Sequence, residues 1–258
     1  MFLEEIESMA NISKKKVDTM KTKPLGYFLM SMLAGIYVGI GIILIFSVGG
    51  LLNAGGFSGT RIVMGVSFGI ALSLVVFAGS ELFTGNNLIM SAGISKGKVS
   101  VFDTVKLWIF CWIGNLVGSV LLALMYVQTG LAIGEVGEFI AKTSVAKTSI
   151  PANELFFRAV LCNILVCLAV WCSNKMKSES GKLIMIFWCL FAFITSGFEH
   201  SIANMTLIAI GVLNPMGEAV RIGGYFYNLF FVTLGNMVGG IAFVAIPYII
   251  AASQKTNK

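Results

Sequence analysis

The chain has 258 residues, of which 57% are hydrophobic and only 12% are charged. This charged share is about half of what a soluble domain carries, and it is too small to cover the surface of one soluble domain. The composition therefore excludes soluble, disordered and nucleic-acid-binding proteins and indicates a membrane protein with several spans. The net charge of +6 then reflects basic residues gathered at one membrane face.

The N-terminal segment, residues 1–25, is rich in charge and lacks the apolar run of a signal peptide. Apolar residues recur within it at roughly helical spacing, beside several lysines. We expect an amphipathic helix that lies on the cytoplasmic surface of the membrane. The alternative is a mobile arm that gates a pore.

Six segments are apolar enough to cross a membrane, which takes about 20 residues each: 26–48, 61–94, 104–131, 153–174, 183–213 and 225–252. Together they predict one channel domain over 26–252, followed by a short cytoplasmic tail at 253–258. With six crossings, most of the 18 lysines and arginines fall on the side of the N-terminus. Because cytoplasmic loops are enriched in these residues, we expect both termini in the cytoplasm.

The two halves of the chain repeat each other at a separation of about 120 residues. The sequence GNLVG in the third span matches GNMVG in the sixth. In the second span, Glu81 and Asn86 have counterparts in the fifth, Glu199 and Asn204, both at an offset of 118 residues. Since three spans per half is an odd number, the halves must cross in opposite senses, as an inverted repeat.

The second and fifth segments are too long for one straight crossing and carry polar residues at mid-depth. Irregular backbone is tolerated at that depth only where protein buries it or water reaches it. We therefore predict that both helices are broken, one near Gly79 and the other near Gly197. The breaks would point helix N-termini toward the centre, where free N–H groups and positive dipole ends favour anions.

Four stretches of sequence resemble the formate/nitrite transporter family: GSELFTGN at 79–86, NILVCLAVW at 163–171, SGFEHSIANM at 196–205 and GNMVG at 235–239. The resemblance covers the chain after its first 25 residues. It implies an all-α, aquaporin-like fold with six transmembrane helices, assembled as a homopentamer with one pore per subunit. It also implies transport of small monovalent anions (formate, nitrite or hydrosulfide) across a bacterial plasma membrane. Within the family, the chain is most similar to the hydrosulfide channels of clostridia.

The resemblance also assigns roles to individual residues. The anion would meet Thr84, His200 and Asn163 in the pore, and Lys147 in a loop at the periplasmic mouth. Apolar side chains would narrow the pore on either side of the histidine: Phe68, Leu72, Leu82 and Phe193. Glu199 and Asn204 would support the broken fifth helix. We expect a structural role also for the other polar residues of the repeated motifs: Glu81, Asn86, Asn115 and Asn236.

His200 is the only histidine in the chain, and it falls at mid-depth, where an ionisable residue indicates function. An imidazole can donate a hydrogen bond to an anion, or a proton when it is charged. A proton supplied to the anion there would give the neutral acid, which could cross the apolar side chains that narrow the pore. Thr84 either contacts the anion or caps a helix end.

The charged residues leave more than one interpretation open. Lys147 either raises the anion concentration at the mouth or is simply solvated, and Lys142 is a competing candidate. Glu81 and Glu199 have no basic partner in their own spans. We expect each to accept hydrogen bonds from backbone N–H groups freed by the breaks, or from a neighbouring subunit.

Two other functions compete with an anion channel: a water or polyol channel and an intramembrane enzyme. The cysteines lie in apolar runs and the histidine is single, so we expect no metal, cofactor or disulfide framework. A water or polyol channel would need paired Asn-Pro motifs, but Asn214-Pro215 occurs once and is typical of a turn. An intramembrane enzyme would have to use Ser201 or Ser80 with His200, and no nucleophile elbow is visible. We therefore expect a transporter; proton-coupled formate or nitrite transport is the alternative mode.

Overall fold

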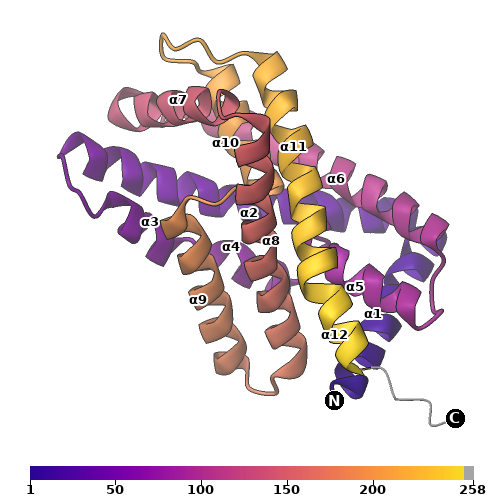
Figure 1. The fold of residues 1–258 in the computed structure, drawn as a ribbon. Coiled ribbons are helices and arrows are strands. Elements are labelled where there is room, and N and C mark those ends of the chain that lie inside the picture. The colour runs from indigo at the N-terminus through magenta and orange to yellow at the C-terminus, as the bar shows by residue number, and fades with distance from the viewer. Residues whose placement is uncertain (253–258) are drawn as a thin grey trace, which may run out of the picture.

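All six predicted spans are helical in the computed structural model, which describes residues 1–252 (Figure 1). The first, third and fourth spans are single helices: α2 (Pro24–Ala54), α6 (Val101–Gln128) and α8 (Ala152–Lys175). The second is divided into α3 (Thr60–Ser67), α4 (Gly69–Leu74), the π-helical turn η1 (Val75–Gly79) and α5 (Phe83–Ser95). The fifth is divided into α9 (Glu179–Ser196) and α10 (Ser201–Leu213), and the sixth into α11 (Ile222–Gly240), η2 (Ile241–Ala245) and α12 (Ile246–Ala252). The predicted tail at 253–258 lies outside the described residues.

The second and fifth spans are broken where the sequence predicts. Gly79 ends η1 with a φ of 79°, and Gly197 ends α9 with a φ of 75°. This left-handed conformation costs glycine little, whereas other residues rarely adopt it. An irregular segment follows each glycine, at 80–82 and 198–200, before the next half-helix begins.

Glycines of the repeated GN motif allow the helices of each half to pack backbone against backbone. A Cβ on Gly118 of α6 would collide with the Met32 carbonyl of α2. A Cβ on Gly239 of α11 would collide with the Val160 carbonyl of α8. Small residues are the usual means of such close approach between helices in membranes, and here they pair α2 with α6 and α8 with α11.

The N-terminal segment forms the helix α1 (Leu3–Thr22), but its apolar face is not directed at lipid. Ile6, Met9 and Val17 are almost completely buried, because α1 packs along α5 and also contacts α8 and α12 (Figure 1). Gly93 of α5 allows the close approach, since a Cβ there would collide with the Ser13 hydroxyl of α1. The interpretation of α1 as a helix on the membrane surface is therefore wrong for its apolar side.

The connection predicted as a loop between the third and fourth spans contains a helix, α7 (Gly134–Thr148). Ile140, Ala141 and Ser144 are buried at helical spacing, because this face of α7 packs against α2 and α10. Lys147 lies in the last turn of α7 and is held in place by the helix.

The two ends of the bundle differ in the elements they carry (Figure 1). The N-terminus and α12 lie at one end, and α7 lies at the other. We call these ends the near face and the far face.

Candidate functional site

The four predicted constriction residues surround His200 in the middle of the chain's own helices. A small chamber is lined by Val38, Phe68, Ala71, Leu72, Leu82, Val166, Leu190, Phe193 and His200. Its volume is about 10 Å³, barely enough for one water molecule. The path is therefore closed to a hydrated ion by apolar side chains. Among the lining residues that the sequence did not predict, Leu190 could have been found, because it is the repeat counterpart of Leu72. Val38 and Val166 could not, because they resemble ordinary packing residues.

The chamber has a different boundary on each side. Leu72 and Leu82 also line a larger cavity at the near face, so they separate that cavity from the chamber. On the other side, the rings of Phe68 and Phe193 meet edge to face with centroids 5.5 Å apart. Phe193 also stacks against His200, with centroids 6.1 Å apart. An anion must therefore cross apolar side chains on both sides of the histidine, where an unscreened charge is costly.

His200 lines this chamber and contacts Thr84, which comes from the opposite half of the repeat and is buried behind the chamber wall. The Nε2 of His200 lies 3.0 Å from the Thr84 hydroxyl. Its Nδ1 accepts a hydrogen bond of 3.2 Å from the backbone N–H of Ala203, so the side chain caps α10. An accepting Nδ1 carries no proton, and the proton of the neutral ring is therefore on Nε2, directed at Thr84. The hydroxyl proton of Thr84 remains available for another acceptor.

Asn163, predicted as a pore residue, lies behind the backbone of Thr84. Its Nδ2 donates to the carbonyls of Thr84 and Asn236, at 3.4 and 2.7 Å, and to the Asn87 side chain at 3.1 Å. Its side chain is fully buried and does not line the chamber. Asn163 therefore braces the broken helices from outside the chamber, and Asn87, which had not been predicted, belongs to the same contact.

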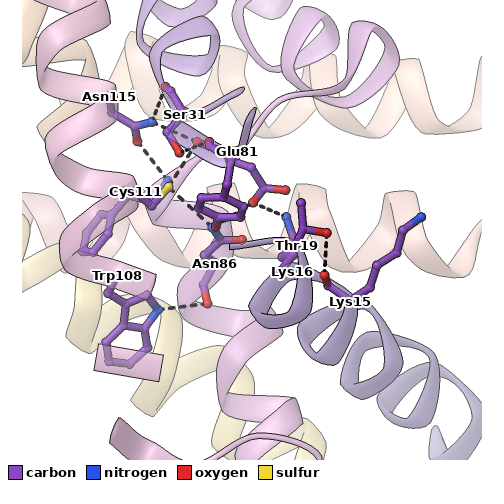
Figure 2. Close-up of polar contacts among 11 residues, drawn as sticks. Lys15, Lys16, Thr19, Ser31, Glu81, Asn86, Trp108, Cys111 and Asn115 are labelled. Carbon is purple, nitrogen blue, oxygen red and sulfur yellow. Dashed lines mark hydrogen bonds and ion pairs between the residues drawn. The ribbon is translucent and has the colours of Figure 1, made fainter. Parts of the chain in front are cut away.

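The asparagine of the GN motif in α6 holds the first break together (Figure 2). The Oδ1 of Asn115 accepts the backbone N–H of Phe83 at 3.0 Å, the first residue of α5. Its Nδ2 donates to the carbonyls of Ser31 and Glu81 at 2.7 and 2.9 Å. One side chain thus satisfies both the start of the half-helix and the irregular segment before it.

The asparagine of the GN motif in α11 makes the same three contacts at the second break. The Oδ1 of Asn236 accepts the backbone N–H of Ser201 at 2.9 Å, and its Nδ2 donates to the carbonyls of Ala159 and Glu199 at 2.8 and 3.0 Å. The N-termini of α5 and α10 do point toward the centre, as predicted. Their first N–H groups, however, are satisfied by these asparagines and are not free for an anion.

The carboxylate at the first break is paired with a lysine from α1 (Figure 2). The Oε2 of Glu81 lies 2.5 Å from the Nζ of Lys16 and also accepts bonds from the Tyr27 hydroxyl at 3.0 Å and from Asn86 at 3.3 Å. The cavity beside this pair has a volume of about 630 Å³, and α1 forms part of its wall. We call this cavity the near mouth. Lys16 and Tyr27 had not been predicted, because neither lies in the second span.

The carboxylate at the second break is paired in the same way. The Oε1 of Glu199 lies 2.6 Å from the Nζ of Lys147, and its Oε2 accepts a bond of 2.6 Å from Asn204. The expectation that the two glutamates bind only freed backbone N–H groups or a neighbouring subunit is therefore wrong. Lys147 is not a free cation, and the competing Lys142 is exposed and pairs with Glu138 of its own helix at 3.1 Å.

Two thiols lie against the breaks. Cys111 donates to the carbonyl of Glu81 at 3.2 Å, and Cys167 donates to the carbonyl of Thr84 at 3.5 Å. Within residues 1–252, all five cysteines are free thiols, and no three histidine, cysteine or acidic side chains are grouped so as to hold a metal ion.

Known proteins are similar in sequence to nearly the whole chain. The nitrite transporter NirC of Escherichia coli is 43% identical over 259 residues, which span 100% of this chain and 95% of NirC. The formate channel FocA of Escherichia coli is 30% identical over 262 residues, which span 93% of this chain and 92% of FocA.

Solved structures have the same fold. A structure described as an FNT family ion channel superposes with a TM-score of 0.92 at 41% identity and covers 97% of this chain and 99% of its own. A pentameric formate channel with formate bound superposes with a TM-score of 0.77 at 29% identity and covers 88% of this chain and 96% of its own.

These relatives are transporters and channels, which confirms the predicted fold and the predicted transport function. The chain is a multi-pass membrane protein and not an enzyme. The family model described as formate/nitrite transporter matches residues 4–250. The chain therefore belongs to the formate/nitrite transporter family.

Proposed function

We propose that the chain is a channel for small monovalent weak-acid anions, with hydrosulfide as the first candidate substrate. The observation that carries the proposal is the His200–Thr84 pair, held at 3.0 Å beside an apolar chamber where the two broken helices meet. Among the three weak-acid anions, hydrosulfide is the smallest and would need the least widening of a chamber of about 10 Å³, which supports it as the first candidate. Nitrite is the second candidate, supported by the 43% identity to NirC over the full chain.

The apolar chamber favours an uncharged permeant. An anion that reaches it accepts a hydrogen bond from the Thr84 hydroxyl or from His200, and it loses most of its hydration. Gaining one proton converts hydrosulfide to hydrogen sulfide, formate to formic acid, or nitrite to nitrous acid. The neutral acid then crosses the apolar side chains and releases the proton on the other side.

The geometry limits how His200 takes part in this step. Its only ring proton is on Nε2, and the Nδ1 is occupied by the N–H of Ala203. Donating the Nε2 proton without replacement would leave an imidazolate anion in an apolar site. His200 therefore supplies a proton only after Nδ1 has taken one up and the bond to Ala203 has broken; otherwise the proton comes from water.

The variant His200→Asn tests whether the histidine controls protonation. We expect anion flux into proteoliposomes to lose its dependence on pH, while circular dichroism and the oligomeric state stay as in the unaltered protein. Thr84→Ser is the matched control, because it retains the hydroxyl. Unchanged pH dependence in His200→Asn would refute a role for the histidine in proton supply.

Substrate choice is tested by comparing hydrosulfide, formate, nitrite and chloride influx at one pH. We expect rapid influx of the three weak-acid anions and little chloride influx, with hydrosulfide fastest. A rank order led by nitrite would place the chain with NirC. Equal influx of all four anions, or passage of water alone, would contradict the protonation step.

We also propose that the chain assembles as a homopentamer in the bacterial plasma membrane, with both termini in the cytoplasm. The pentameric formate channel, which matches 88% of this chain, supports the assembly. The lysines of α1 and of the α8–α9 connection, which lie at the near face, support the orientation.

A further inference from the structure

Three basic residues lie near the break at Gly197, but only one has no carboxylate partner among residues 1–252; Arg158, whose carbonyl accepts the N–H of Glu199, is paired with Glu154. Lys147 is paired with the buried carboxylate of Glu199 at 2.6 Å, so the pair adds little net charge to its surroundings. Arg61, in the first turn of α3, has no carboxylate within ion-pair distance among residues 1–252. Its positive charge is therefore available to an anion from solution.

The side chain of Arg61 lies directly on the break. A Cβ placed on Gly197 would be 3.3 Å from the Nη1 of Arg61. The face of α3 that carries Arg61 is the face toward α9, because Gly65, one turn later, lies against the Thr195 side chain. The guanidinium thus sits at the far end of the contact between α3 and α9, where the chain turns back toward His200.

The equivalent break in the other half of the repeat has no such cation beside it. Gly79, the counterpart of Gly197, lines the near mouth, and no atom lies within 4 Å of the position of its Cβ. The counterpart of Arg61 at the same offset of 118 residues is Glu179, an acidic residue. The position that is basic at the far face is therefore acidic at the near face.

We propose that Arg61, and not Lys147, recruits the anion to the far side of the channel. The inference rests on the proposed anion conduction and names the residue that attracts the substrate. A fixed positive charge at the far face, beside the break that leads to His200, stabilises an anion that approaches from that side. The planar guanidinium also matches the two oxygens of formate or nitrite, whereas hydrosulfide would respond to charge alone.

A structural role would have a different signature. A guanidinium at the C-terminal end of α9 also interacts favourably with the helix dipole. Loss of that interaction would lower the stability of the protein and would not depend on the charge of the permeant. Recruitment by charge, in contrast, changes flux in proportion to the charge at position 61 and weakens as salt screens it.

The experiment compares Arg61→Lys, Arg61→Gln and Arg61→Glu in proteoliposomes. Formate influx is measured at sub-saturating concentration, at about 10 mM and about 0.5 M ionic strength, where screening lengths are roughly 30 Å and under 8 Å. We expect Arg61→Lys to stay within about twofold of the unaltered channel, Arg61→Gln to fall about threefold and Arg61→Glu about ninefold at low salt, since each unit of charge contributes a similar factor. At high salt, the differences should shrink to less than about twofold.

The double variant Glu138→Gln/Lys142→Gln is the matched control. It removes an exposed ion pair from the same far face and leaves the net charge unchanged, so its influx should be unchanged. Equal influx of Arg61→Gln and the unaltered channel at low salt would overturn the inference. So would a loss that is the same in Arg61→Lys and at both salt concentrations, since that outcome identifies Arg61 as a cap of α9. Absence of influx of formate, nitrite and hydrosulfide alike in the unaltered channel would instead refute the proposed function.

Discussion

Each break of the repeat holds a carboxylate against a lysine that comes from another element. Glu199 has only 3% of its side chain exposed, and its partner Lys147 has 18%. An ionised carboxylate left without a partner at such burial costs several kcal/mol, although the intact pair itself adds little stability. The two lysines therefore serve mainly to neutralise the glutamates of the broken segments, and little of their charge is left for an anion.

Removing one partner should be far more damaging than removing both. We expect Lys147→Gln to lower the free energy of unfolding by about 3 kcal/mol, because it leaves Glu199 buried and unpaired. The double variant Lys147→Gln/Glu199→Gln should recover most of this loss. Thermal unfolding in detergent, followed by circular dichroism, measures both.

The exposed pair on the same helix provides the control for that series. Lys142→Gln breaks a pair that is more than half exposed on both sides, and such pairs contribute roughly 0 to 1 kcal/mol. The thermal unfolding midpoint of Lys142→Gln should stay close to that of the unaltered protein. A double variant no more stable than Lys147→Gln alone would contradict the pairing argument.

The two broken helices are each fastened by one asparagine of the GN motif. Asn115 and Asn236 make three equivalent contacts, one to the first N–H of a half-helix and two to carbonyls. At roughly 1 kcal/mol for each hydrogen bond, either side chain contributes about 3 kcal/mol. The repeat in the sequence thus corresponds to a repeated set of hydrogen bonds that anchors each half-helix.

This symmetry makes a quantitative prediction. Asn115→Leu and Asn236→Leu should each lower the free energy of unfolding by about 3 kcal/mol and should agree within about 1 kcal/mol. Both should also reduce anion flux, because the half-helices that position Thr84 and His200 lose their anchors. A large loss in one variant and none in the other would show that the halves are not mechanically equivalent.

For α1, the sequence correctly predicted an amphipathic helix, but the prediction that its apolar side lies against lipid was wrong. Apolar spacing reveals an amphipathic helix but does not distinguish a lipid surface from a protein surface. The same limit applies to α7, whose buried face is spread among small residues. The breaks at Gly79 and Gly197 were predictable, because polar side chains next to a glycine at mid-depth are incompatible with an unbroken helix facing lipid. Lys16 and Tyr27 were not, because contacts between distant elements leave no local pattern.

Docking of α1 on α5 can be tested at their point of closest approach. Gly93→Leu would place a side chain where the Ser13 hydroxyl now lies, so α1 should detach while the six spans remain helical. Limited proteolysis should then cleave within residues 1–22 much faster than in the unaltered protein. The control is Gly223→Leu, since a Cβ there has no atom within 4 Å. Continued protection of α1 in Gly93→Leu would contradict this docking.

At the scale of the whole molecule, the chamber is complete within one chain. Every residue that lines it, from Val38 in α2 to His200 before α10, belongs to the same subunit. Apolar side chains remain exposed along α6 and α11, including Ile109, Ile113, Phe226 and Phe230, and in a pentamer these faces are shared between lipid and neighbouring copies. We expect assembly to stabilise the subunits, with each subunit enclosing its own chamber.

Independent pores within one assembly predict a linear response to inactive subunits. Native mass spectrometry should give a particle of five times 27.7 kDa. When the unaltered chain is co-expressed with Asn115→Leu in varying ratios, anion flux per pentamer should rise in proportion to the number of unaltered subunits, because each chamber opens on its own. A steep, cooperative loss of flux at low fractions of the variant would show instead that the subunits open together, and that contacts between chains control the chamber.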